Sequence, residues 1–397
     1  MELFLQFGHG MMEHCRQLVS RWGGGTVILS PRDLTEDQLS TVSSDVIKRG
    51  GSTMLDPQFY DPRGDHHGLV KHTYWPENYT TSLFLPGAQL TQLLNDLIYL
   101  NDIAKTGKFI LPSLYCERVD GDWLAVQGAI IDESVRLITD KPRFATICIS
   151  GEALRFEEQV EALLNASEDW DVQGYYVVPE HPNGTYLVDD PMWLANLLNL
   201  CSGLKLQDRK VVVGYASHQM LPLACAGVNA IASGTWLNVR SFSTKKFQEP
   251  MSGQGGRRAT WYYSPQTLSE YKLPFLDIAF SQGVLPSLAV PVTFSSKYAD
   301  VLFSGAQPTT TTYSEQNAFR HYLDCVHYQC SQLVKASFQE TVDSQLRLLD
   351  DVEGTIRVAH RAGVRGQDRD FSDCIDVSRA ALGVFVDNRG FVMNRQW

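Results

Sequence analysis

Short runs of apolar, β-prone residues alternate with longer segments of helical period over the first 235 residues of the chain. In the short runs, branched and aromatic side chains are bounded by Gly, Pro, Asp or Ser, which is typical of buried strands. The pattern predicts eight strands, at residues 3–7, 26–30, 52–55, 108–112, 143–149, 174–178, 210–215 and 229–233.

The segments between these runs repeat their apolar residues at the spacing of a helix with one buried face. They cover residues 11–22, 35–49, 90–105, 123–139, 152–170, 189–203 and 219–227. Thr35, and Asp190 before Pro191, are typical helix starts. Strands that alternate with helices pair in parallel through right-handed crossovers. Eight such units within about 235 residues predict a (β/α)8 TIM-like barrel.

An open, doubly wound α/β sheet is the alternative arrangement of the same units. Such sheets often carry a GxGxxG turn after an early strand, and the glycines at 8–10 and 23–25 lack that spacing. The sequence has no GxxxxGK[ST] phosphate-binding loop either. We therefore prefer the barrel.

The character of the chain changes after Thr235. A stretch with Gly and aromatic residues at 241–265 leads into irregular sequence, and helical periodicity returns between Glu315 and about Ala362. We assign residues 1–247 to the barrel. Residues 248–397 are expected to supply barrel-closing helices and a C-terminal, mainly helical extension.

The composition is that of an ordinary globular protein. Of 397 residues, 44% are hydrophobic and 20% are charged, which supplies a large core without a bias toward disorder. No apolar run reaches the roughly 18 residues of a membrane-spanning helix, and the start of the chain does not look like a secretory leader. We expect a cytoplasmic protein with no membrane partner.

Charge and cysteine usage narrow the possible chemistry further. A net charge of -11 argues against a general nucleic-acid binder, because phosphate contacts require many Lys and Arg residues, but it leaves room for a local basic patch. The eight cysteines are scattered without a CxxC pair, so buried, reduced thiols are expected. We expect no cofactor and no metal ion.

Asp56 is the strongest candidate for chemistry, within the polar stretch at residues 52–68. A carboxylate at the end of a strand and before a proline can act as a nucleophile or general base, although Asp before Pro also caps ordinary turns. In a parallel barrel, residues that follow strands share one face. The other polar residues expected at that face include Asp61, Arg63, His66, Glu180, His218, Ser233, Asn238 and Arg240, together with His9, Ser30, Arg32, Tyr115, Glu117, Ser150 and His181.

Three further groups of residues have a pattern that can carry function. His321 and Cys325 have the i, i+4 spacing of a zinc pair, although a half-buried helix face produces that spacing more often. Basic and aromatic residues that are interleaved occur in nucleic-acid contacts, and equally in solvated loops. The basic members of two such clusters are Lys245, Lys246, Arg257 and Arg258, and then Arg357, His360, Arg361, Arg365 and Arg369.

The order of these features resembles the tRNA-guanine transglycosylase superfamily, including its DNA-directed branch that inserts 7-deazaguanine bases. The similar segments are Leu55-Asp56-Pro57, GYYVVPE at 174–180, the connection at 211–240, and FRHYLDCVHYQC at 319–330. The resemblance implies a barrel that exchanges a guanine-type base for a 7-deazapurine base through an aspartate. It implies nucleic acid as a partner, DNA more than tRNA, and further proteins of a modification complex.

The resemblance also assigns roles to residues of this chain. Asp56 and Glu180 are expected to be catalytic. The substrate-binding group is Asp61, Arg63, His66, His218, Ser233, Asn238 and Arg240, and the nucleic-acid group is Lys245, Lys246, Arg257 and Arg258. Two departures stand out, since the family's aspartate after the eighth strand is replaced by Ala232-Ser233-Gly234-Thr235 and its CxCxxC…H zinc motif is missing.

Two other functions are compatible with the same sequence. The missing acid after the eighth strand favours a non-catalytic barrel that binds nucleic acid or acts as a scaffold subunit of a modification or defence complex. A metal-dependent hydrolase built on Asp56, His66 and His218 is the third hypothesis.

Overall fold

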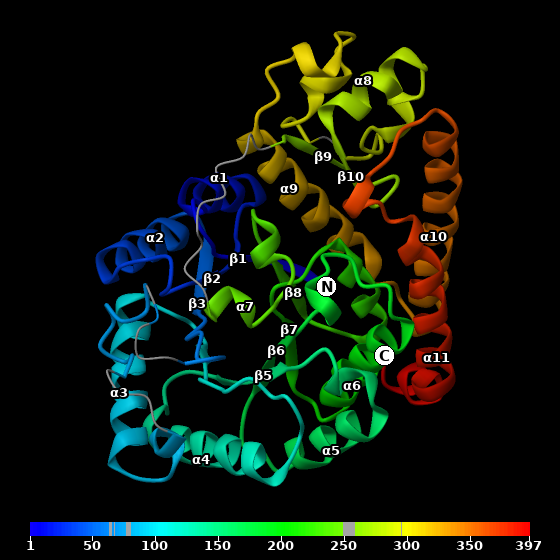
Figure 1. The fold of residues 1–397 in the computed structure, drawn as a ribbon. Coiled ribbons are helices and arrows are strands. Elements are labelled where there is room, and N and C mark those ends of the chain that lie inside the picture. Colours follow the sequence, from blue (N-terminus) through cyan, green and yellow to red (C-terminus); the bar gives the residue numbers. More distant parts are fainter. Residues whose placement is uncertain (63–65, 67, 77–80, 249–258, 295) are drawn as a thin grey trace.

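The computed structural model describes residues 1–62, 66, 68–76, 81–248, 259–294 and 296–397. Eight parallel strands alternate with helices and form a nearly closed (β/α)8 TIM-like barrel, followed by a mainly helical C-terminal region (Figure 1). The strands are β1 Glu2–Gln6, β2 Gly25–Leu29, β3 Gly51–Leu55, β4 Phe109–Ile110, β5 Arg143–Ile149, β6 Gly174–Pro179, β7 Lys210–Val213 and β8 Ala230–Ser233. The pattern of apolar runs therefore predicted every barrel strand.

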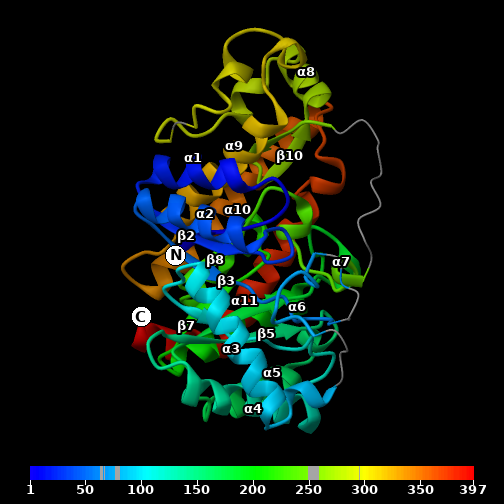
Figure 2. The same cartoon turned by 90° about the vertical axis from the view of Figure 1, so that its left-hand side faces the viewer.

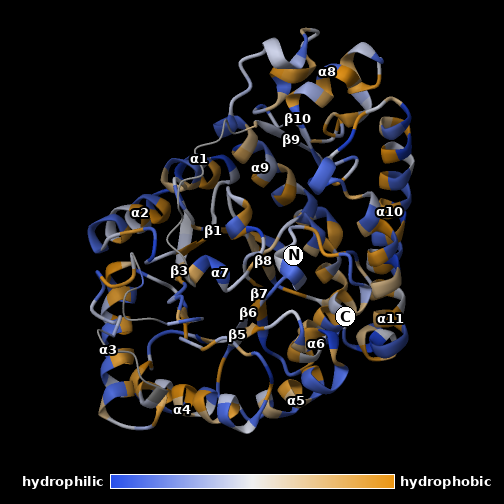
Figure 3. Ribbon diagram, viewed as in Figure 1, coloured by the Kyte–Doolittle hydropathy of each residue, from blue (hydrophilic) through white to orange (hydrophobic). Residues whose placement is uncertain are grey.

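The helices of the barrel lie outside the strands, as Figure 1 shows for α2 and α3 to the left of β3; Figure 2 views the same side face-on. They are α1 Met12–Trp22, α2 Glu36–Lys48, α3 Ala88–Ile103, α4 Gly121–Leu137, α5 Glu157–Ser167 and α6 Pro191–Leu206. A 3-10 helix, His218–Ala226, occupies the place of the seventh predicted helix. Hydrophobic and hydrophilic residues alternate along these helices (Figure 3), as expected where one face packs against strands.

Two predicted helix starts are confirmed by their capping hydrogen bonds. The Thr35 side chain accepts from the Gln38 backbone amide, and the Gln38 side chain accepts from the Thr35 amide in return. The Asp190 carboxylate accepts from the amides of Met192 and Trp193 at the start of α6. Such bonds satisfy amides that have no partner within the helix.

The barrel closes by a loop contact at one seam. The hydrogen-bonded strand order is β3-β2-β1-β8-β7-β6-β5-β4, and β4 has only two residues, so β3 and β4 form no ladder. The Gly107 amide instead donates to the Thr53 carbonyl at 3.1 Å, and the Thr53 hydroxyl donates to the Ala104 carbonyl at 2.9 Å. The predicted closed ring of strands is therefore only nearly complete.

Side chains alternate between the interior of the barrel and the helical layer. On β6, Tyr176 and Val178 belong to the interior cluster, whereas Tyr175 and Val177 pack with the outer helices. This alternation follows from the two-residue period of a strand. The interior is therefore a packed core, and the residues that follow the strands lie at the mouth, where the carboxyl ends of the strands meet.

After β8 the chain forms a short helix, α7 Lys245–Gln248, and then a hairpin that the apolar pattern did not predict. The hairpin pairs β9 Trp261–Ser264 with β10 Ser269–Lys272 in antiparallel fashion. The remaining helices are α8 Leu273–Ser281, α9 Glu315–Leu333, α10 Phe338–Arg361 and α11 Ser372–Gln396. The helical periodicity at 315–362 thus corresponds to two helices.

The late helices complete the outer layer of the barrel. Helix α9 packs against α1 and β1, and α11 packs along α6, as Figure 1 also shows. Within the described part of the chain, no helix has both the length and the apolar character needed to cross a bilayer.

Candidate functional site

A carboxylate surrounded by hydroxyl groups lies at the mouth of the barrel, directly after β3. Asp56 Oδ1 accepts hydrogen bonds from the Tyr60 hydroxyl at 2.7 Å and from the Gln58 backbone amide at 3.0 Å. Asp56 Oδ2 accepts from the hydroxyls of Tyr215 at 2.9 Å and Tyr176 at 3.4 Å. The loop after β3, strand β6 and the end of β7 therefore each supply a donor to one carboxyl group.

The surroundings of Asp56 change its acidity in two opposite directions. The side chain has no exposed surface, and this burial raises the carboxyl pKa to about 6. Hydrogen bonds from Tyr60 and Tyr215 favour the charged form and limit the rise. A carboxyl group with a pKa of about 6 is mostly ionised at neutral pH, and it can also take up a proton there.

Two residues that hold this cluster have a backbone conformation that side chains rarely adopt. Gln58 has a φ of 58° and Tyr215 has a φ of 51°. The Gln58 side chain donates to the Tyr215 hydroxyl at 3.2 Å and accepts from the Ser30 hydroxyl at 3.1 Å. Strained residues of this kind cluster at functional sites, because the surrounding structure must stabilise them at a cost of about 1 to 3 kcal/mol each.

A glycine makes room for one of the donors. A side chain at Gly214 would collide with the Tyr176 hydroxyl. Any larger residue there would push Tyr176 away from Asp56. The glycine is therefore part of the arrangement that brings the tyrosine to the carboxylate.

Aromatic rings cover the carboxylate on the side of the mouth. Tyr60 packs edge-on against Tyr215, Phe242 and Phe247, with ring centroids 5.0 to 6.2 Å apart. Phe242 and Phe247 come from the segment that follows β8 and includes α7. A substrate reaches Asp56 only if some of these rings move.

An open hollow of about 610 Å³ lies beside the covered carboxylate. Tyr60 lines this hollow and also donates to Asp56, so its ring separates the two. Tyr115 and Thr244 line the hollow as well, and both donate hydrogen bonds to the Glu180 carboxylate. Asp56 and Glu180 therefore each lie behind residues of the same wall.

Other residues predicted for the mouth, and those predicted for nucleic-acid contacts, are spread around the Asp56 cluster. Asp61 lines the hollow, and His66 packs against Phe247 with ring centroids 6.0 Å apart. The Lys246 ammonium donates to the Asn238 carbonyl at 3.0 Å, and burial with nearby Arg32 lowers the pKa of Lys246 to about 7. Lys245 is exposed. Arg63, Arg257 and Arg258 lie outside the described residues.

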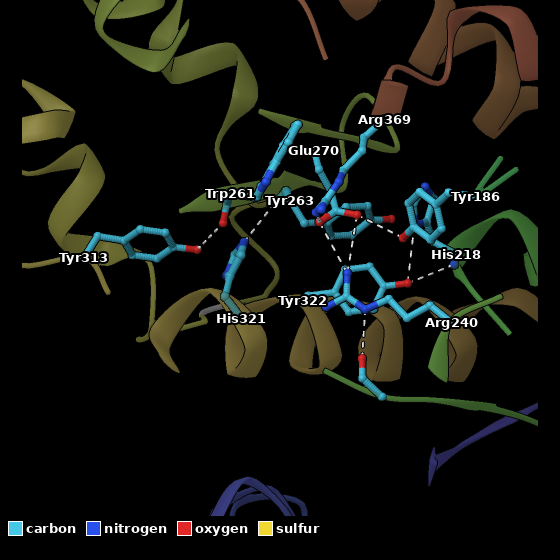
Figure 4. A network of polar contacts seen from close by, with 11 residues as sticks. Tyr186, His218, Arg240, Trp261, Tyr263, Glu270, Tyr313, His321, Tyr322 and Arg369 are labelled. Carbon is cyan, nitrogen blue, oxygen red and sulfur yellow. Dashed lines mark hydrogen bonds and ion pairs between the residues drawn. The ribbon is translucent and has the colours of Figure 1, made fainter. Parts of the chain in front are cut away.

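A second polar network takes up other predicted residues, away from Asp56 (Figure 4). The Arg240 guanidinium donates to both oxygens of the Glu270 carboxylate at 3.3 Å. The Arg369 guanidinium donates to one of these oxygens at 2.8 Å. The Arg240 guanidinium also lies 3.4 Å from the centre of the Tyr322 ring. His218 contacts the same tyrosine through its backbone amide at 3.1 Å.

His218, Ser233 and Arg240 are therefore not part of the Asp56 cluster. All three are buried, and Ser233 lies next to Tyr322 at the end of β8. Burial lowers the pKa of His218 to about 4, so its imidazole is neutral at physiological pH. The polar residues predicted for one mouth thus divide between the Asp56 cluster with its hollow and the Glu270 network.

His321 is bound on both sides of its ring. Its Nδ1 lies 2.9 Å from the Ser296 hydroxyl and its Nε2 lies 2.9 Å from the Tyr263 carbonyl, beside a buried Cys325. Among the described residues, no three His, Cys, Asp or Glu side chains lie close enough together to hold a metal ion. Asp56, His66 and His218 accordingly do not form such a cluster.

Three of the five late basic residues contact acids, and one of them, Arg369, pairs with Glu270. Arg357 pairs with Glu353 at 2.6 Å, and His360 contacts Asp370 at 2.9 Å. The second basic cluster therefore contributes to packing of the extension through these contacts.

All eight cysteines are free and buried, as predicted.

The sequence reasoning missed the three tyrosines that surround Asp56. Tyr176 was detectable as an inward position of β6, and Tyr215 as a polar residue two positions after the end of β7. It also missed Glu270, whose hairpin gave no strand signal. No local pattern relates these residues to one another, because their partners lie far away along the chain.

Comparisons with known proteins leave the family open. No protein-family model matches the chain, and no curated protein matches it. Among solved structures, similar chains include a candidate lyase/mutase from Burkholderia cenocepacia J2315, with 13% identity, a TM-score of 0.33, and coverage of 58% of this chain and 75% of that chain. The homocysteine methyltransferase MmuM from Escherichia coli has 11% identity and a TM-score of 0.33, and the match covers 59% and 91% of the two chains.

A third similar structure is the carboxyl transferase domain of Rhizobium etli pyruvate carboxylase with pyruvate. It has 10% identity and a TM-score of 0.36, and the match covers 98% of this chain and 61% of that chain. At such TM-scores these likenesses support no conclusion about this chain.

Proposed function

We propose that the protein is a transglycosylase that exchanges a guanine-type base for a 7-deazaguanine derivative in DNA or tRNA, with Asp56 as its catalytic carboxylate. The observation that carries the proposal is the Asp56 cluster: a fully buried carboxylate at the end of β3, bound by three tyrosine hydroxyls and a backbone amide. The nature of the nucleic acid and of the incoming base comes from the sequence resemblance.

The acidity of Asp56 suits nucleophilic attack on a sugar. With its pKa raised to about 6 by burial, the group is mostly charged at neutral pH, yet it is only weakly hydrated. One carboxylate oxygen attacks C1′ of the nucleotide, and the bond from C1′ to the outgoing base breaks. The electron pair stays on the base nitrogen, which takes up a proton.

The second half of the exchange restores the enzyme. The incoming base, after loss of a proton from its ring nitrogen, attacks C1′, and the bond between C1′ and Asp56 breaks. Glu180 is the proposed group for the two proton transfers, since its carboxylate lies behind Tyr115 and Thr244 in the wall of the hollow.

The hollow suits an uncharged base better than a phosphate. Its charged residues are three acidic ones, Asp61, Glu117 and Asp120, and one basic one, Arg118. The backbone of a nucleic acid would lie closer to Arg32 and Lys245, beyond the rings that cover Asp56. A base drawn out of its stack would then enter the hollow, and displacement of the Tyr60 ring would expose Asp56.

The test is a base-exchange assay with duplex DNA, single-stranded DNA and tRNA, each preloaded with labelled guanine. We expect Asp56→Asn to reduce release of the label by about a thousandfold or more, because a nucleophile is removed. Asp122→Asn, a change of an exposed aspartate at the start of α4, should leave the rate unchanged. Full activity of Asp56→Asn would exclude the assignment.

One observation favours the non-catalytic alternative. The Asp56 carboxylate is already bound by four donors and has no exposed surface, which also describes a structural buried acid. If the protein binds one of the three polymers with a steep salt dependence but releases no guanine from any, the binding or scaffold function replaces base exchange.

A further inference from the structure

A cavity of about 230 Å³ lies outside the Asp56 cluster, between the end of β8, the hairpin and the first half of α9. Aromatic rings form much of its wall, from Trp236, Trp261 and Phe319. Trp236 and Phe319 meet edge to face with ring centroids 4.7 Å apart. The Glu270 network of Figure 4 forms the other side.

The charges around the cavity cancel. Arg240 and Arg369 line it together with Glu270 and Glu315, two cations against two anions. Both guanidinium groups already contact the Glu270 carboxylate. An anion placed there would face two carboxylates, so the cavity offers no net attraction for a phosphate or carboxylate ligand.

The wall offers flat surfaces instead. The Arg369 guanidinium already stacks on the Trp261 ring, with its central carbon 3.9 Å from the ring centre, and the Lys272 ammonium lies 5.0 Å from that centre. Planar guanidinium groups and aromatic rings are the surfaces on which nucleobases stack, with little regard to which base is present. The volume is below the roughly 300 Å³ at which pockets for drug-sized ligands begin, so a small ring system fits better than a whole nucleotide.

Two polar atoms of lining residues lack a hydrogen-bond partner in the described part of the chain. They are the hydroxyl of Thr235, which is almost fully buried, and Nε of Arg369. Buried polar atoms are nearly always bonded, so each needs a partner that the described residues do not supply. Rotation of the Thr235 side chain about its Cα–Cβ bond can turn its hydroxyl toward a ligand in the cavity.

We propose that this cavity binds a free purine base, stacked between the Trp236 ring and the stack of Trp261 with the Arg369 guanidinium, and hydrogen-bonded by Thr235. A purine combines a flat, uncharged double ring with ring nitrogens that accept hydrogen bonds, which matches the walls and the unpaired donors. The proposal does not rest on base exchange, because Asp56 takes no part in this cavity.

The test measures binding of adenine and of hypoxanthine to the full chain by equilibrium dialysis, with cytosine and inorganic phosphate as further probes. We expect both purines to bind at one site per chain. Trp261→Leu should raise the dissociation constant at least tenfold through loss of stacking, and Thr235→Val about three- to tenfold through loss of one hydrogen bond. Trp261 lines this cavity and not the hollow beside Asp56, so a loss of purine binding in Trp261→Leu separates this proposal from the catalytic one.

Controls exclude unfolding as the cause of any loss. Thr235→Val removes a hydroxyl without a partner among the described residues, so its melting temperature without ligand should not fall. Trp397→Leu changes a tryptophan near the end of α11, away from the cavity, and should leave purine affinity unchanged. The proposal is wrong if neither purine binds at millimolar concentration, if phosphate displaces bound purine, or if Trp261→Leu leaves the affinity unchanged.

Discussion

At the scale of single residues, Asp56 illustrates how the tertiary structure sets the surroundings of a residue that the sequence shows only by its position. The position after a strand and before Pro57 was equally compatible with a nucleophile and with a turn cap. In the structure its carboxylate oxygens accept hydrogen bonds from the hydroxyls of Tyr60, Tyr176 and Tyr215, and none of its surface is exposed. That environment is costly for a charge, so it makes the group titrate in an unusual range.

The stability of the protein should therefore depend on the ionisation of Asp56. Below the ordinary pKa of 3.8 the carboxyl is protonated in both the folded and the unfolded chain. Between that value and about 6, the unfolded chain loses the proton while the folded protein keeps it, so the free energy of unfolding falls as the pH rises. Two pKa units correspond to about 3 kcal/mol.

The Asp56→Asn variant removes this titration and tests its size. The free energy of unfolding of the variant minus that of the unchanged protein should rise by up to about 3 kcal/mol between pH 4 and pH 7, measured by urea unfolding. For Asp122→Asn, an exposed site, the same difference should stay flat. A flat difference for Asp56→Asn would show that the carboxyl titrates normally.

At the scale of elements, a buried glutamate of the hairpin β9–β10 forms ion pairs with the barrel and with the C-terminal region. Glu270 of β10 contacts Arg240, which follows β8, and Arg369, which precedes α11. Burial by itself raises the pKa of Glu270, but the two guanidinium groups outweigh it and hold the pKa below the ordinary value. Segments 30 and 99 residues from Glu270 are thereby joined at a single carboxylate.

Removing this charge should loosen the hairpin. Glu270→Gln leaves the buried Arg240 without a compensating charge, and we expect the free energy of unfolding to fall by about 3 to 5 kcal/mol. Glu168→Gln, at an exposed position after α5, should change it by less than about 0.5 kcal/mol. Urea unfolding of both variants measures the difference, and equal stabilities would contradict this view of the network.

At the scale of the whole molecule, the barrel depends on a seam where strand pairing stops. Strand β4 is too short to pair with β3, and the Thr53 side chain bridges the gap through the carbonyl of Ala104. The residues that follow β3 and β4 also meet there, since the Tyr115 amide donates to the Tyr60 carbonyl. The seam therefore supports the loops on which the Asp56 site is built.

Weakening the seam should lower the free energy of unfolding and should speed hydrogen exchange at the seam itself. Thr53→Val removes the hydroxyl that the Ala104 carbonyl accepts, and we expect a loss of about 1 to 2 kcal/mol in the free energy of unfolding. Hydrogen exchange at the Gly107 amide, which bonds the Thr53 carbonyl, should become faster. Thr53→Ser keeps the hydroxyl and should behave as the unchanged protein. If Thr53→Val exchanges no faster there, the seam does not depend on this side chain.

The sequence by itself determined the alternation of strands and helices, and with it the barrel. Apolar periodicity is a local property, so β5 Arg143–Ile149 could be predicted to the residue and the Thr35 cap from its own position in the chain. The hairpin gave no such signal, because its strands of four residues bury both faces against a region formed by α8 and α9. Short elements that are stabilised by distant partners have no period long enough to detect.

Only the tertiary structure decided which polar residues belong together. Asp56 and Tyr215 are 159 residues apart, and nothing in either segment specifies the other. The same folding placed Arg240 and His218 beside Glu270 rather than beside Asp56, although all follow strands of one barrel. Such groupings arise from contacts across the whole chain, whereas periodicity and capping act over a few residues, and this difference in range separates what the sequence could predict from what it could not.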